Sequence, residues 1–318
     1  MTDDFMQVSK RAFGRWGQRL LAAGLFLVVF GFLGWSVLRE WDTLKSYPWR
    51  LNVSYVVLAS VFHSLALGST FVVWHLMLCR LGHIDDVRIN APIYYLSTLA
   101  KRVPSAIWYV GGRLVMYQRV GVVRPVVLNA LLLETVLIGG AGVLVYLVLL
   151  PFYSWTSTGV SWPVAIIGIV TLLAFFIRPR WLLDVTNTML RRWNRDPLQA
   201  DVTRRDLLLW VGIYLIPWPL AGISLFFIIQ AMTPGITADL VGVIGVSTLS
   251  MLVALVGLIL PAGLGLKELT IAALMSPWLP LSVGVVVAIA YRALQTLDEM
   301  MWAALIYGLY GRLFLGDS

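Results

Sequence analysis

The sequence predicts an all-α polytopic membrane protein with about six full spans and two re-entrant helical hairpins. Hydrophobic residues make up 59% of its 318 residues, charged residues make up 13%, and the mean hydropathy is +0.84. This composition excludes a soluble globular domain of the same length. About 20 apolar residues are needed to cross the hydrocarbon core of a bilayer. Six segments are long enough, namely residues 20–38, 53–79, 125–150, 161–177, 207–232 and 282–311.

Two further apolar segments are each interrupted by a proline beside fixed charges. In lipid, an unpaired backbone amide has no water to satisfy it, so a broken helix survives only inside protein or around a polar cavity. We therefore expect both segments to be re-entrant hairpins, although residues 240–260 could instead form a full span. The breaks lie in residues 90–112, at Lys101-Arg102-Val103-Pro104, and in residues 240–276, at Pro261-Ala262-Gly263-Leu264-Gly265-Leu266-Lys267-Glu268.

The basic residues outside the spans predict how the chain is oriented. If the N-terminus is cytoplasmic, most of them lie on the cytoplasmic side, Arg113 among them, whereas the outer loops hold only Arg39, Lys45 and Arg50. This is the positive-inside pattern, and it places both termini in the cytoplasm at the plasma (inner) membrane. Topology and anionic lipid account for the net charge of +8, so we expect no nucleic-acid partner.

The predicted segments repeat in the same order along a single transmembrane domain, residues 1–318. The first half, about 20–152, contains span, span, hairpin and span, starting inside. The second half, about 160–312, has the same order starting outside. This is an inverted repeat, in which the two hairpin tips would meet near the bilayer midplane.

Eight charged residues are left at membrane depth once the loops are assigned. Each would cost about 2.5–3.5 kcal/mol if it faced lipid at mid-depth, so we expect them to converge on a polar interior. Proline in the first turn of a helix leaves the positive end of the helix dipole open to an anion such as phosphate. The eight are Lys101, Arg102, Glu134, Lys267, Glu268, Arg292, Asp298 and Glu299.

These observations predict a binding site for an anionic substrate. The alternative is that the charges are structural, for example as the ion pairs Arg292–Glu299 and Lys267–Glu268. The three histidines have no metal-ligand spacing, so we expect neither a metal nor another cofactor. The predicted substrate-binding residues are Lys101, Arg102, Arg113, Glu134, Lys267, Glu268, Arg292 and Glu299, and the helix breaks are Pro104, Pro261, Gly263 and Gly265.

Residues 94–113 contain the pattern Leu-x-Lys-Arg-Val-Pro-x-x-Ile-Trp-x-x-Gly-Gly-Arg, which resembles the transmembrane family named after lysylphosphatidylglycerol synthase. Glu134, the second break and Ala290-Tyr291-Arg292 extend the resemblance over about residues 20–312. In that family the membrane domain of the synthase flips aminoacylated phosphatidylglycerol between leaflets. Stand-alone members occur beside glycolipid, hopanoid and polyprenyl-linked sugar pathways. This sequence lacks the soluble aminoacyl-transferase domain, so we do not expect lysyl transfer, and its first break has Pro-Ser-Ala where many relatives have Pro-Gly-Gly.

The leading hypothesis is a flippase or scramblase, and not an enzyme, for an anionic lipid or a polyprenyl-phosphate-linked glycolipid. The alternative is an integral-membrane glycosyltransferase that uses a polyprenyl-phosphate sugar donor, for which Glu40-Trp41-Asp42 is the candidate acidic motif. A non-transporting partner in envelope assembly would not explain eight intramembrane charges. The expected partners are a membrane phospholipid or a lipid-linked sugar phosphate, with a homo-oligomer or an envelope-biosynthesis enzyme as further possibilities.

Overall fold

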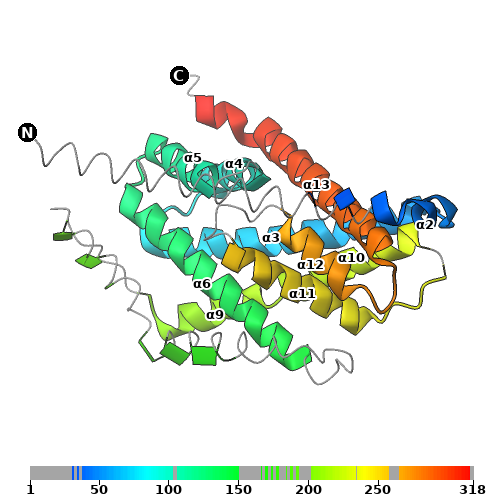
Figure 1. Cartoon of the computed structure of the whole chain (residues 1–318). Coiled ribbons are helices and arrows are strands. Elements are labelled where there is room, and N and C mark those ends of the chain that lie inside the picture. Colours follow the sequence, from blue (N-terminus) through cyan, green and yellow to red (C-terminus); the bar gives the residue numbers. More distant parts are fainter. Residues whose placement is uncertain are drawn as a thin grey trace, which may run out of the picture.

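The structure, a computed structural model, is helical in all the regular elements of the residues it describes. These are residues 41–102, 106–149, 202–233, 235–257 and 265–315, with scattered positions between 31 and 40 and between 166 and 192. The predicted spans 20–38 and 161–177 lie mostly outside them. Figure 1 shows the helices packed together, with long helices crossing the bundle and shorter ones between them.

Four helical stretches are long and apolar enough to cross a membrane: Val53–Gly82, Arg124–Leu149, Arg204–Met232 and Leu281–Tyr310. They correspond to helix α3 (Val53–Gly82), helix α6 (Arg124–Leu149), the pair α9 and α10 (Arg204–Tyr214 and Pro217–Met232), and helix α13 (Leu281–Leu315). Four of the six predicted spans are thereby confirmed as helices, and the chain is an integral membrane protein.

Local chemistry explains where these helices begin and end. Asn52 starts α3 by accepting the backbone N–H of Ser54, and His83 ends it in the left-handed conformation. Thr203 and Asp206 form a capping box at the start of α9. Pro217 is the first residue of α10, a position where the missing N–H of proline costs no helical hydrogen bond, so it separates α9 from α10.

Both segments predicted as hairpins consist of two helices separated by a break. In the first, α4 (Val87–Leu99) continues as a short 3-10 helix (Ala100–Arg102) and is followed by α5 (Ala106–Arg119). In the second, α11 (Leu240–Gly257) is followed by α12 (Leu266–Leu274), which Gly265 precedes with a φ of 90°. The two arms of each segment pack against each other. Their depth in the membrane, and the choice between span and hairpin for residues 240–260, stay predictions.

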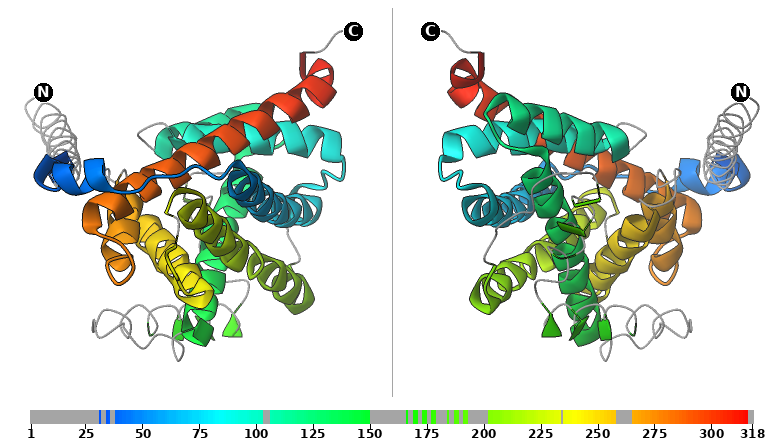
Figure 2. Two further views of the ribbon diagram at one scale, coloured as in Figure 1. Left: turned by 90° about the vertical axis from the view of Figure 1, so that its right-hand side faces the viewer. Right: turned by 90° about the vertical axis from the view of Figure 1, so that its left-hand side faces the viewer.

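The packing partners of the two halves are related. Helix α3 packs along α10, while α4 packs on α13 and α11 packs on α6 (Figure 2). Suppose that α3 is exchanged with α10, α4 with α11, α5 with α12 and α6 with α13. The contact between α3 and α10 then maps onto itself, and the contacts α4–α13 and α11–α6 map onto each other. An inverted repeat would give this packing, although the repeat itself stays a prediction. The buried apolar residues form two main clusters, one centred on α3, α4 and α6 and one on α10, α11 and α13.

Candidate functional site

Helices α12 and α13 bring three of the predicted charged residues together. Glu268 lies in the first turn of α12 and is buried, and its Oε1 is 2.9 Å from Nη1 of Arg292 on α13. The neighbouring Lys267 donates a hydrogen bond of 2.8 Å from Nζ to Oε1 of Gln295, one turn further along α13. Lys267 also lies 5.0 Å from the ring centroid of Tyr291. Two cations and one carboxylate thus meet between a short helix and a long one.

The charged side chains of this cluster differ in how exposed they are. The side chain of Arg292 is 29% exposed, whereas that of Glu268 is 8% exposed. Oε2 of Glu268 is buried and has no hydrogen-bond partner among the described residues. The N-cap of α12 is Gly265, which has no side chain that could cap the first backbone N–H groups of the helix. The cationic side of this cluster can therefore meet an anion that enters from outside the bundle.

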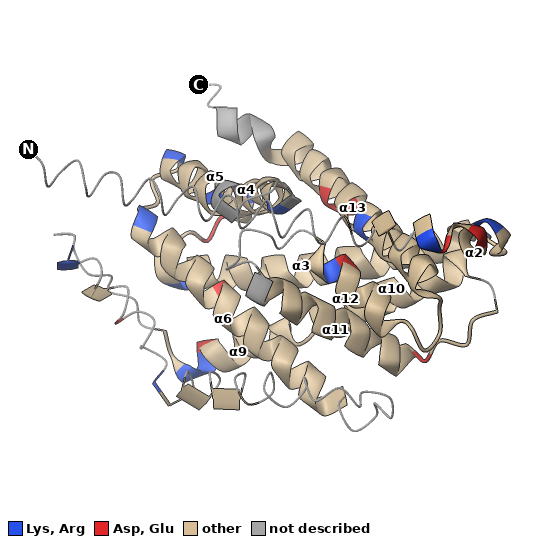
Figure 3. Ribbon diagram, in the orientation of Figure 1, with Lys and Arg blue, Asp and Glu red and all other residues tan. Residues whose placement is uncertain are grey.

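Two more carboxylates follow on the same helix. Arg292, Gln295 and Glu299 are spaced three and four residues apart, so they share one face of α13. Asp298 and Glu299 are both buried. Asp298 Oδ1 accepts a hydrogen bond of 2.6 Å from Oγ of Ser60, which places this carboxylate against α3. In Figure 3 charged residues are sparse along the helices, and several of those in the interior lie on α12 and α13.

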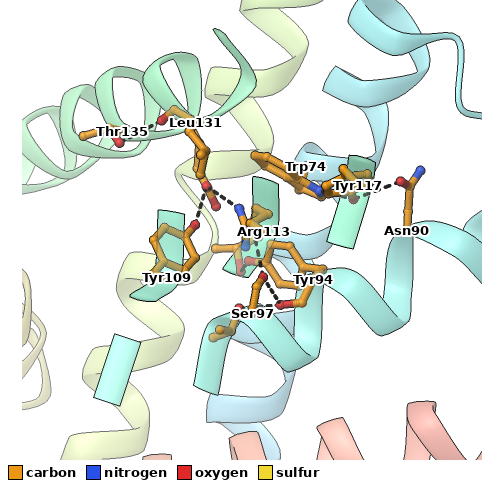
Figure 4. Close-up of polar contacts among 12 residues, drawn as sticks. Trp74, Asn90, Tyr94, Ser97, Tyr109, Arg113, Tyr117, Leu131 and Thr135 are labelled. Carbon is orange, nitrogen blue, oxygen red and sulfur yellow. Dashed lines mark hydrogen bonds and ion pairs between the residues drawn. The ribbon is translucent and has the colours of Figure 1, made fainter. Parts of the chain in front are cut away.

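A second ion pair joins α5 to α6. Nη1 of Arg113 is 2.8 Å from Oε2 of Glu134, and the Arg113 side chain is completely buried. The hydroxyl of Tyr109 donates to the same carboxylate oxygen at 2.8 Å, and Nε of Arg113 donates to Oγ of Ser97 at 2.9 Å (Figure 4). This pair therefore ties the second arm of the first hairpin both to its first arm and to a long helix.

Aromatic rings enclose the Arg113 guanidinium. Its Cζ lies 4.0 Å from the ring centroid of Trp74, 4.5 Å from that of Tyr109 and 4.8 Å from that of Tyr94. Rings at these distances attract a cation through the negative charge of their faces. Trp74 in turn donates to the hydroxyl of Tyr117, and that hydroxyl donates to Asn90. The cation is fixed by a network that spans four helices.

The burial of Arg113 corrects one expectation. The orientation count placed Arg113 in a cytoplasmic loop, because Gly111-Gly112-Arg113 was taken as the end of an apolar segment. Helix α5 instead continues to Arg119, and Arg113 is an interior residue of that helix. The set of eight interior charges expected from the sequence therefore lacks one buried cation. The signal that could have found it is the group of aromatic residues at Tyr94, Tyr95 and Tyr109 around a charged position.

The remaining predicted residues are only partly described. Lys101 is exposed, and its Nζ lies 4.4 Å from the ring centroid of Tyr109. Arg102 lies in the 3-10 helix, but its side chain is outside the described residues, as are Pro104, Pro261 and Gly263. The structure therefore groups the predicted residues into two clusters, one on α5 and α6 and one on α12 and α13. A single cavity containing all of them stays a prediction.

The family with the description "lysylphosphatidylglycerol synthase TM region" matches residues 17–297 of the chain. The chain belongs to this family. The match spans both clusters and stops just before Asp298 and Glu299. No curated protein matches the chain. As a member of the lysylphosphatidylglycerol synthase transmembrane family, the protein has a role connected with membrane lipids.

Proposed function

We propose that this protein moves an anionic lipid, or a polyprenyl-phosphate-linked glycolipid, between the two leaflets of the inner membrane as a flippase or scramblase. The observation that carries the proposal is the pair Lys267 and Arg292 at the α12–α13 contact. Cations are costly within a membrane and usually mark the path of a substrate or an ion. Family membership supports a lipid as the substrate.

The geometry suggests how a phosphate would bind. Lys267 donates to the neutral amide oxygen of Gln295, and a phosphate would offer it a charged acceptor instead. Arg292 is partly exposed beside Glu268, so a phosphate oxygen can reach it from the open side. The backbone N–H groups at the start of α12 would add donors and a positive dipole end. Glu268 would hold Arg292 in place while the site is empty.

Arg113 has a different role in this proposal. Its guanidinium is sealed by Glu134, Ser97 and aromatic rings, and the side chain has no exposed surface. A phosphate could not reach it without displacing packed rings. We therefore assign Arg113 and Glu134 to fixing the first hairpin against α6, and the second cluster to contact with the substrate.

The glycosyltransferase alternative needs a free acidic residue near the outer surface. Glu40 belongs to the only candidate motif, and its Oε2 accepts the backbone N–H of Ser282 at 3.0 Å, at the start of α13. This carboxylate is occupied as a helix cap, so the exposed Asp42 is the remaining candidate of that motif for catalysis. Cytoplasmic termini, and assembly with a second copy or with an envelope-biosynthesis enzyme, remain part of the proposal.

Translocation in proteoliposomes tests the proposal. Fluorescent phosphatidylglycerol would be incorporated symmetrically, and the fraction reached by an external quencher would be followed over time, with phosphatidylcholine as the neutral comparison. We expect Lys267→Gln to slow phosphatidylglycerol movement by about 10-fold or more, since a hydrogen bond to a charged group contributes about 1.5–3 kcal/mol. Lys45→Gln, which removes an exposed lysine of α2 (Trp41–Ser46), is the matched control.

Two results would contradict the proposal. One is wild-type protein that moves neither labelled phosphatidylglycerol nor a labelled polyprenyl phosphate faster than protein-free vesicles. The other is release of sugar from a polyprenyl-phosphate sugar to an acceptor without lipid movement, which would establish the enzyme instead.

A further inference from the structure

An open groove of about 690 Å³ runs between α3 and α13. Its α3 wall includes Val61, Leu65 and Val72, and Met301 and Trp302 contribute from α13. Tyr95 of α4 closes one side and stacks on Trp302, with their ring centroids 6.2 Å apart. Both α3 and α13 are helices long and apolar enough to span a membrane, so the groove lies between two spans.

The lining of the groove is mostly apolar even though it includes three serines. Ser60 donates its hydroxyl to Asp298, and Ser64 accepts the indole N–H of Trp302 at 2.8 Å. Ser69 donates to the backbone oxygen of Ala66 at 2.7 Å. Each serine hydroxyl thus makes one hydrogen bond within the protein, and most of the other lining residues are apolar. A groove of this kind is filled best by an apolar chain.

The surroundings of the groove are also apolar and exposed. Leu65 is 54% exposed, Val61 48%, and Val72 and Met301 are 44% each. Large apolar side chains with this exposure are expected where a span faces lipid. From Val61 to Val72 the helix rises about 16 Å, which gives the groove roughly the length of half a bilayer core.

The groove lies beside the charged residues of α13. Along α13, Arg292, Gln295, Glu299 and Trp302 are spaced three, four and three residues apart and so follow one face. The rise from Arg292 to Trp302 is about 15 Å. Ser60 belongs to the groove and contacts Asp298, at the end of the charged stripe. The apolar groove therefore begins where the polar stripe ends.

We propose that the α3/α13 groove holds a hydrocarbon chain of the lipid whose phosphate binds at Lys267 and Arg292. This inference rests on the proposed function and makes it more specific. The ligand must be a lipid that enters sideways from the bilayer between α3 and α13. A water-soluble phosphate or sugar phosphate would leave the groove unused.

Gly68 provides a clean means of filling the groove. It lines the groove, and a Cβ atom built on it meets no other atom within 4 Å. Gly68→Leu should therefore occupy the space of the chain without straining the packing of α3. Gly308 on α13 is equally unobstructed, is exposed and does not line the groove. Gly308→Leu is the matched control.

The test uses full-length protein in vesicles that contain phosphatidylglycerol with a photoactivatable diazirine on one acyl chain. After illumination, adducts are mapped by mass spectrometry. We expect adducts on the groove residues of α3 and α13 to exceed those on the exposed face of α9, at Leu208 and Leu209. Gly68→Leu should lower groove labelling by about tenfold, because it removes several buried methylene contacts, and Gly308→Leu should not change it.

The possible outcomes separate the two proposals. Labelling spread evenly over exposed apolar residues, or groove labelling unchanged by Gly68→Leu, would overturn the groove as a chain site. If that variant does not fold, the wild-type adduct map decides alone. A groove that takes the chain in a protein that moves no lipid would refute the proposed function only. A competition experiment adds either free inorganic phosphate or excess unlabelled phosphatidylglycerol before illumination. If phosphate reduces groove labelling as strongly as phosphatidylglycerol does, the acyl chain adds nothing to binding, and the inference is overturned.

Discussion

Replacing Arg113 should destabilise the protein more than replacing any of the partly exposed cations. Arg113→Met keeps a long apolar side chain but leaves Glu134 buried without its cation. Removing one partner of a buried ion pair costs about 3–5 kcal/mol, because the other charge stays desolvated. The rings of Trp74, Tyr94 and Tyr109 also lose their cation, and each such contact contributes about 0.5–2 kcal/mol. We therefore expect a loss of at least about 3 kcal/mol in the free energy of unfolding.

The double variant separates pairing from packing. Arg113→Met with Glu134→Leu removes both charges, so no carboxylate is left alone in the interior. Replacing a buried pair by apolar residues of similar size is often close to neutral. Ser97 and Tyr109 would still lose partners, at about 1 kcal/mol each. We expect the double variant to recover at least about half of the loss caused by Arg113→Met.

Unfolding in mixed micelles, followed by intrinsic tryptophan fluorescence, measures these differences. The comparison needs the wild type, both single variants and the double variant, because their combination gives the coupling between Arg113 and Glu134. A double variant whose loss equals the sum of the two single losses would refute the reasoning. It would mean that the two side chains act independently, despite the 2.8 Å between them.

Two further predictions follow from close contacts and from an exposed carboxylate. A Cβ on Gly142 of α6 would lie 2.3 Å from the Trp218 ring on α10, so Gly142→Ala should lower the free energy of unfolding by about 1–3 kcal/mol. Gly139→Ala is the control, because a Cβ on Gly139 would come no closer than 3.9 Å to another side chain, and we expect it to be near neutral in the same unfolding measurement. The contacts of Glu40 with the hydroxyl and the backbone N–H of Ser282 hold its pKa below the ordinary value of 4.5. The stability that this cap adds should therefore be complete above pH 4.5 and be lost as the pH falls through the lower folded pKa. Glu40→Gln should abolish that component of the acid dependence, and an identical acid profile for variant and wild type would reject the cap.

The sequence was sufficient for features that depend on local length and pattern. Apolar segments of spanning length predicted α3, α6 and α13, and the two prolines predicted helix–break–helix segments in the right places. The family resemblance also followed from local motifs, and the match over residues 17–297 confirms it. These signals need no knowledge of which segments pack together.

The contacts between segments could not be predicted in the same way. Trp74 lies on α3, 39 positions before Arg113 in the sequence, and nothing local links the ring to the guanidinium. The suggested pair Lys267–Glu268 joins adjacent helix positions, which point in different directions. The structure pairs each of them with α13 instead, Glu268 with Arg292 and Lys267 with Gln295.

The two cation clusters show why a count of intramembrane charges cannot by itself identify a binding site. In the first pair the arginine lies on the earlier helix, α5, and the glutamate on α6. In the second pair the glutamate lies on the earlier helix, α12, and the arginine on α13. The distance between the nearest nitrogen and oxygen atoms is nearly the same, 2.8 Å and 2.9 Å. What separates them is the remaining surroundings of each arginine. Arg113 is enclosed by rings that stabilise a cation, and its side chain is completely buried, so a ligand could reach it only by displacing packed side chains. Arg292 keeps an open side, and beside it Lys267 is held by a neutral amide. The first cluster pairs one arginine with one carboxylate, whereas the second has two cations beside Glu268. We therefore expect a phosphate to bind at the second cluster, where it would balance the additional cation.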